Sequence, residues 1–186
     1  MTNAELAILS LIVQEPRYGY QIEQVIEERG MRDWASISFS AIYYLLGKLE
    51  KLGWVTSETN LEDSAGPVRK VYRVTKEGMK AWRQATREVL SSPQRYCTPL
   101  QVGLANLPAL TKDEAIDALS LYKKRLAERK AYVRKNLSAV RSKGFIPWHV
   151  EIMFDLSLTM TDAEQAWVSR LIKRLSSKRD KGNSSA

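Results

Sequence analysis

The chain has 186 residues, of which 44% are hydrophobic and 27% charged, a composition that suits one or two small globular domains. Its formal net charge of +8 and pI of about 9.6 favour a polyanionic partner. One cysteine, Cys97, and one histidine, His149, exclude an intramolecular disulfide and a thiolate metal cluster within one chain, and we expect neither metal nor cofactor. No signal peptide and no membrane span are predicted, so we expect a cytoplasmic protein.

The charge is unevenly distributed along the chain. Residues 1–90 hold 12 basic and 12 acidic residues, whereas residues 91–186 hold 17 and 9. A DNA-binding surface in the first half therefore requires local sorting of charge. We interpret the excess in the second half as a solvated helix face and a basic tail.

Two helices are predicted at the start. The first spans residues 3–14, with Asn3 as its N-cap, and ends before Pro16. The second follows Tyr18 and runs to about Arg29, where Gly30 fits a helix C-terminus. Residues 31–37 are predicted to be a loop.

A third helix, residues 38–53, has two distinct faces. Its apolar positions share one stripe: Ile42, Leu45, Leu46, Leu49 and Leu52. Along the other face the side chains are first small, then aromatic and then cationic. These residues are Ser40, Tyr44, Gly47, Lys48 and Lys51, and Ala41 and Tyr43 flank them. Such a face suits a helix in the DNA major groove, although an ordinary surface helix has similar periodicity.

A β-hairpin is predicted next. Residues 54–59 and 68–74 are rich in β-branched and aromatic residues and flank a polar turn at residues 60–67. A further helix begins near Thr75 and continues through Val89. Three helices followed by a hairpin are typical of a winged helix-turn-helix, which we predict for residues 1–90.

Several short sequence motifs in this half resemble those of the PadR family of bacterial transcriptional regulators. They are Leu9-Ser10-Leu11 with Pro16 and Tyr18-Gly19-Tyr20-Gln21-Ile22; Ser40-Ala41-Ile42-Tyr43 with Leu46, Leu49, Glu50 and Gly53; and the segment from Gly66 to Thr75, closed by Gly78. The resemblance implies a DNA-binding regulator, usually a repressor, that responds to small aromatic compounds.

We expect DNA contacts from the third helix, from residues that precede it and from the β-hairpin, which we call the wing. The residues are Tyr18, Ser38, Ser40, Ala41, Tyr43, Tyr44, Lys48, Arg69, Lys70 and Arg73. Ser40, Tyr43 and Tyr44 are expected to position the helix and contact bases, and Lys48 to contact phosphate. Arg69 and Lys70 suit the backbone or minor groove. Arg73 could instead pair with a carboxylate.

The second half is predicted to be helical. Residues 91–110 form a linker and a short helix, residues 111–176 two long helices, and residues 177–186 a disordered basic tail. A capping box at Thr111 and Glu114 opens the first long helix, and Pro147 fits the start of the second. A second possible capping box, at Thr161 and Glu164, leaves open a break near Met160.

Apolar residues recur every seven positions in the first long helix and form a stripe along one face of the second. This pattern predicts a coiled-coil-like homodimer. The expected interface residues are Ile116, Leu119, Leu126, Val133, Leu137, Val140, Ile152, Leu156, Trp167 and Leu171. A free-standing helical hairpin is the alternative, but two helices alone bury little surface. The second half also resembles the C-terminal dimerisation domain of the longer PadR regulators, by architecture.

Aromatic side chains suggest a pocket for a flat effector, lined by Trp82, Tyr96, Trp148 and Trp167, although such rings are also common in cores. No nucleophile–base pair or phosphate-binding loop is present, so we predict no enzymatic activity. Two functions remain: a dimeric DNA-binding regulator released by a small aromatic effector, or a winged-helix module that binds proteins.

Overall fold

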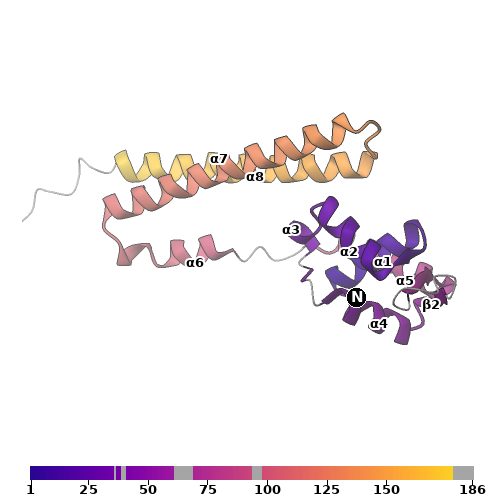
Figure 1. Ribbon diagram of the computed structural model, residues 1–186. Helices are drawn as coiled ribbons and strands as arrows, with labels where there is room; N and C mark the ends of the chain where they lie inside the picture. The colour runs from indigo at the N-terminus through magenta and orange to yellow at the C-terminus, as the bar shows by residue number, and fades with distance from the viewer. Residues whose placement is uncertain (36, 39–40, 61–68, 94–97, 178–186) are drawn as a thin grey trace, which may run out of the picture. The chain divides into compact units, whose positions relative to one another are not determined.

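The computed structural model describes residues 1–35, 37–38, 41–60, 69–93 and 98–177. It separates into two compact units, Met1–Arg95 and Tyr96–Ala186 (Figure 1). The described residues are mostly helical, with one small antiparallel sheet, which confirms the predicted fold class. Asn60, the first residue of the predicted turn, ends β2. The rest of that turn (residues 61–67), Tyr96, Cys97 and the tail from residue 178 lie outside the described residues.

The first unit is a winged helix-turn-helix. Its elements are α1 (Asn3–Gln14), β1 (Arg17–Tyr18), α2 (Gly19–Glu28), α3 (Arg32–Ala35), α4 (Ala41–Lys51), β2 (Val55–Asn60), β3 (Arg69–Val74) and α5 (Lys76–Ser91). The strand order is β1-β3-β2, and both pairings are antiparallel. The wing hairpin aligns Val55 with Val74 and Asn60 with Arg69.

Three details of this unit differ from the predictions. Thr2, not Asn3, caps α1, because the Thr2 hydroxyl accepts the Glu5 amide while the Glu5 carboxylate accepts the Thr2 amide. The predicted loop at residues 31–37 contains α3. The strand β1 was not predicted, because two residues carry no detectable alternation and depend on pairing with the distant β3.

One apolar core holds the unit together. Its fully buried members come from α1, α2, α4 and β2: Ile8, Leu9, Leu11, Ile12, Ile22, Ile26, Ile42, Leu46, Leu49 and Val55. Leu52 is an exception to the predicted stripe: it follows α4 and is 47% exposed. The core fixes which face of α4 points inward, and so which face is left for a partner.

The wing joins α5 at a corner where two backbones touch. The Thr75 amide donates to the Trp54 carbonyl at 3.1 Å, and the Thr75 hydroxyl donates to the Gly53 carbonyl at 2.7 Å. Gly78 lies in the first turn of α5, where an added Cβ would be 1.9 Å from the Trp54 carbonyl oxygen. Position 78 therefore requires glycine, because the Trp54 backbone lies too close for any side chain.

The second unit contains α6 (Pro99–Ala105), a 3-10 turn (Leu107–Ala109), α7 (Lys112–Ser142) and α8 (Trp148–Ser177). The predicted capping box of Thr111 and Glu114 opens α7. The possible break near Met160 is absent from α8. The Thr161 hydroxyl instead donates to the Ser157 carbonyl at 2.8 Å, one turn earlier in a continuous helix.

The helices α7 and α8 form an antiparallel hairpin with its own apolar seam (Figure 1). Leu119 and Leu126 of the heptad are buried against Val168 of the same chain. A polar link between the Tyr122 hydroxyl and Glu164 Oε1, at 2.6 Å, lies beside this seam. Ion pairs of Lys130 with Asp162 and Arg141 with Glu151 also join the two helices.

Candidate nucleic-acid interface

The outward face of α4 is aromatic. Tyr44 is 71% exposed and Tyr43 58% exposed, whereas the four buried residues of the helix face the core. Two exposed rings on one helix present apolar surface that a partner would cover. Of the predicted residues, Ser38 precedes α4 and is exposed, whereas Ala41 begins α4, is half-buried and packs against the core. Ser40 lies outside the described residues.

The N-terminus of α2 lies against the ring of Tyr43. A Cβ added at Gly19 would be 2.7 Å from a ring carbon of Tyr43, so a larger residue would displace that ring. On either side of Gly19, the rings of Tyr18 and Tyr20 stack with centroids 5.6 Å apart. Tyr18, which is predicted to contact DNA, ends β1, and Tyr20, which is not among the predicted contacts, lies beside it in the first turn of α2.

Lys48 is held by a buried carboxylate. Its Nζ lies 2.5 Å from Oε1 of Glu5, whose side chain is only 4% exposed. Burial by itself raises the pKa of Glu5, but the hydrogen bonds from Lys48 and Thr2 and the nearby positive charges outweigh it, so the pKa is lowered. The ammonium expected to contact phosphate is thus engaged within the protein.

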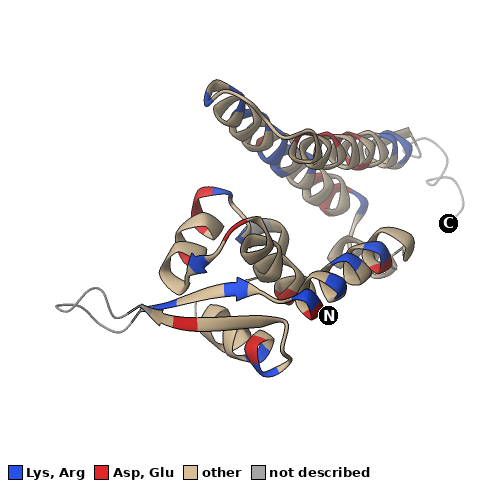
Figure 2. Cartoon of the chain, turned by 90° about the vertical axis from the view of Figure 1, so that its right-hand side faces the viewer, with Lys and Arg blue, Asp and Glu red and all other residues tan. Residues whose placement is uncertain are grey.

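The wing provides basic groups of two kinds. Figure 2 shows basic residues along β3 and an acidic one on the neighbouring β2. Lys70 is exposed, and the Arg73 guanidinium lies 3.7 Å from Glu58 in a solvent-exposed pair, the alternative considered for Arg73. Exposed pairs of this kind contribute about 0–1 kcal/mol, so a phosphate could displace the carboxylate. Arg69 belongs to β3, and its side chain is not among those described.

The residues predicted for a dimer interface are buried, half-buried or exposed in this chain. Leu119 and Leu126 are buried inside the hairpin of one chain, because a heptad does not specify whether its partner helix is in the same chain. Within one chain these two residues pack against α8, and their role in a dimer stays a prediction. Ile116, Val133, Leu137, Val140 and Leu171 are half-buried in the same unit.

A second apolar surface lies on the outer side of α8. We call it the α8 stripe, and its members are Ile152 (54% exposed), Leu156 (61%), Met160 (43%) and Trp167 (39%). The spacing of four residues between the first three keeps them on one helix face. These residues, unlike Leu119 and Leu126, are available to a partner.

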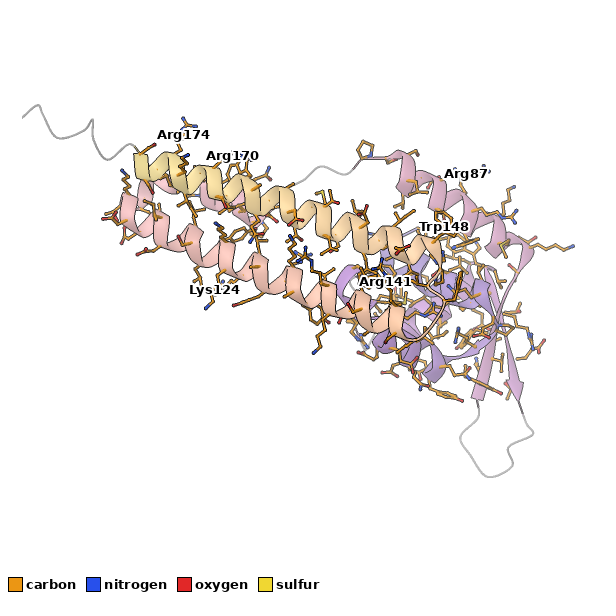
Figure 3. All side chains as sticks on the ribbon, turned by 90° about the horizontal axis from the view of Figure 1, so that it is seen from above. Arg87, Lys124, Arg141, Trp148, Arg170 and Arg174 are labelled. Atoms are coloured by element: carbon orange, nitrogen blue, oxygen red, sulfur yellow. The ribbon has the colours of Figure 1, made fainter. Side chains whose placement is uncertain are left out.

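The aromatic residues proposed to line an effector pocket are divided between the two units. Trp82 packs against the core of the first unit, and Tyr96 lies outside the described residues. Trp148 is 74% exposed at the turn end of the hairpin, near Arg141, whereas Arg170 and Arg174 mark the other end of α8 (Figure 3). Nineteen residues of helix place Trp148 about 28 Å from Trp167.

Trp167 does line a groove in the second unit. The groove has a volume of about 350 Å³ and lies between α6 and α8. Its lining is Leu100, Gln101 and Leu104 from α6, Thr98 just before that helix, and Met160, Ala163, Glu164 and Trp167 from α8. Aliphatic side chains beside one indole and a few polar groups suit a flat organic molecule.

Within the described ranges, no group of three His, Cys, Asp or Glu residues is arranged to hold a metal ion. No helix among the described residues has both the length and the apolar character needed to cross a membrane.

These features define a winged helix-turn-helix protein with a second, helical unit. Residues 8–84 match the family model described as Transcriptional regulator PadR-like family. The winged helix-turn-helix unit therefore carries the PadR-like domain that its sequence motifs indicated. A comparison with curated protein sequences gave no match.

Solved structures of the family share the fold over nearly the whole chain. PadR of Bacillus subtilis in complex with operator DNA matches with a TM-score of 0.76 at 18% identity, covering 92% of this chain and 98% of that one. The same protein with p-coumaric acid gives 0.75 at 17% identity, covering 94% and 99%. The PadR-like regulator BC1756 of Bacillus cereus gives 0.63 at 20%, covering 92% and 94%.

Proposed function

We propose that this transcriptional regulator is a dimeric repressor that binds operator DNA through α4 and the wing and is released by a small aromatic effector. The observation that carries the proposal is the outward face of α4, where Tyr43 and Tyr44 are exposed on a helix whose other face is fully buried. In helix-turn-helix proteins, the N-terminal part of the second helix contacts base edges in the major groove.

The charges on the wing also support DNA binding. Lys70 and Arg73 project from the central strand β3, and Lys70 is exposed. Cationic side chains on a wing contact the phosphate backbone or a narrow minor groove. A phosphate backbone could bind both cations, whereas a neutral protein partner would bind neither, so the two charges favour DNA over the alternative of a protein-binding module.

The first prediction concerns base recognition. Replacing Tyr44 by Ala should weaken operator binding by about tenfold and non-specific DNA binding by less than about threefold, because a contact to base edges carries sequence information. Tyr132→Ala is the matched control, since Tyr132 is 54% exposed on α7 in the other unit. Fluorescence anisotropy with the DNA upstream of the gene and a scrambled duplex measures both affinities.

An equal loss on both duplexes would remove Tyr44 from base recognition. If neither duplex binds while a protein partner does, the winged unit is an interaction module.

The dimer is proposed to form through the α8 stripe. A two-helix hairpin buries few side chains completely, and the stripe leaves four large apolar residues exposed on one side. A second copy would cover the stripe with an identical one, as twofold symmetry requires. The half-buried members of the predicted interface flank the hairpin seam and would be secondary contacts.

The effector is proposed to bind in the groove between α6 and α8. The related PadR of Bacillus subtilis was solved with p-coumaric acid, a flat phenolic compound. Met160 and Trp167 belong to both the groove and the α8 stripe, so a ligand there could alter dimer packing. It must bind better to the conformer that does not bind DNA, because equal affinity for both conformers shifts nothing.

The second prediction tests this groove. Phenolic acids and flat cationic drugs should quench the tryptophan fluorescence of the wild type, and most of this quenching should disappear in Trp167→Phe. Trp148→Phe, at the far end of α8, is the matched control and should retain the quenching. Any compound that quenches should also release DNA in a gel shift. Quenching that leaves the operator complex intact would show a site without a switch.

A further inference from the structure

We propose that Glu5 and Lys48 form a positioning pair that fixes α4 against α1, and that Lys48 acts on the operator by holding Tyr44 in place, not by contacting phosphate. The inference rests on the proposed function, because it concerns the helix assigned to the major groove. It assigns Glu5 and Lys48 a role that the sequence did not indicate, across a separation of 43 residues.

The Glu5 carboxylate is fixed by the N-terminal cap of α1, independently of its bond with Lys48. Its Oε2 accepts the Thr2 amide at 2.9 Å, and the Glu5 amide donates to the Thr2 hydroxyl at 3.2 Å. This reciprocal capping fixes the Glu5 side chain at the start of α1. Its other oxygen, Oε1, faces α4 and accepts the Lys48 ammonium at 2.5 Å.

The pair connects two helices that also share the core. Ile8 and Leu9 of α1 and Leu49 of α4 are completely buried in the same apolar cluster. A core contact can tolerate a small rotation or slide of a helix, whereas a charged hydrogen bond has a narrow range of distance and angle. Tyr44 precedes Lys48 by four residues, so both lie on the same side of α4.

A direct phosphate contact by Lys48 conflicts with this arrangement. If its ammonium moved to DNA, it would leave the Glu5 carboxylate buried without its cation, which is strongly unfavourable. While the pair is intact, the carboxylate neutralises the ammonium, so Lys48 should release no counterion when DNA binds. The salt dependence of binding therefore separates a positioning role from a phosphate contact.

Full-length wild type, Glu5→Gln, Lys48→Met, their double variant and Lys70→Met test the inference. Gln at position 5 retains the capping geometry of α1 but loses the charge. Operator and scrambled-duplex affinities are measured from about 50 to 200 mM salt, the range in which phosphate contacts change affinity most clearly. Circular dichroism verifies that each variant is folded, and the double variant leaves no buried charge unpaired if a single one fails to fold.

We expect Lys48→Met and Glu5→Gln each to lower operator affinity about tenfold and to change scrambled-duplex affinity less than about twofold. Lys48→Met should leave the salt slope unchanged. The double variant should lose no more than either single one. Lys70→Met, an exposed wing cation, should lower both affinities and reduce the slope by about one.

A slope reduced by about one in Lys48→Met, with unchanged operator affinity in Glu5→Gln, would overturn the inference and restore the phosphate contact. The same holds if all pair variants bind both duplexes as the wild type does while Tyr44→Ala loses operator binding. If Tyr44→Ala also binds the operator normally, then α4 is not the DNA-binding surface. In that case both the proposed function and the positioning role of the pair are wrong.

Discussion

Replacing Leu156 by Asp should convert the protein from a dimer to a monomer and lower its operator affinity by roughly 100-fold or more. Leu156 is 61% exposed in the middle of the α8 stripe, between Ile152 and Met160. A carboxylate there would be desolvated without a partner in the dimer but would remain hydrated in the monomer. A monomer engages only one half-site, so the gain from simultaneous binding of two linked sites is lost.

Light scattering at micromolar concentration and a gel shift measure the two effects. Leu121→Asp is the matched control, because Leu121 is 49% exposed on α7 and is not part of the α8 stripe. It should remain dimeric and bind DNA as the wild type does. A Leu156→Asp protein with wild-type mass, or a wild type that is itself monomeric at this concentration, would contradict the proposed interface.

Replacing Gly78 by Ala should destabilise the first unit by about 3 kcal/mol or more, a large overpacking effect. The added methyl would be 1.9 Å from the carbonyl oxygen of Trp54 and 2.8 Å from its carbonyl carbon. Backbone atoms cannot move aside as a flexible side chain can, so α5 must shift away from the wing. The amide of Gly78 would then lose its bond to the Thr75 hydroxyl.

Chemical denaturation followed by circular dichroism measures this loss. Gly47→Ala is the matched control: Gly47 lies inside α4 with no atom within 4 Å of an added Cβ, so alanine should stabilise the helix by about 0.5–1 kcal/mol. If Gly78→Ala unfolds at the same denaturant concentration as the wild type, the corner described for Thr75 and Trp54 does not exist in solution.

The elements most accurately predicted from sequence have strong local signals. Apolar periodicity placed α4, and a complete capping box placed the start of α7 at Thr111. The wing followed from two β-rich segments around a polar turn. The strand β1 and the helix α3 were missed, since elements of two and four residues depend on contacts with the rest of the unit.

The candidate site could be predicted only in part, for the same reason. Exposure of Tyr43 and Tyr44 follows from helical spacing, a local property. The pairing of Glu5 with Lys48 depends on how α1 packs against α4, and no pattern in one segment indicates it. The groove around Trp167 likewise depends on α6 meeting α8, and no pattern in one segment indicates it.

The most direct test of the account is a hydroxyl-radical footprint of the full-length protein on the DNA upstream of its gene, with the mass of the complex determined in parallel. The account predicts two protected half-sites, related by symmetry, with centres ~34–36 Å apart or a multiple of that distance, and two chains in each complex. Protection without sequence preference at physiological salt, or a single chain for each protected site, would contradict it.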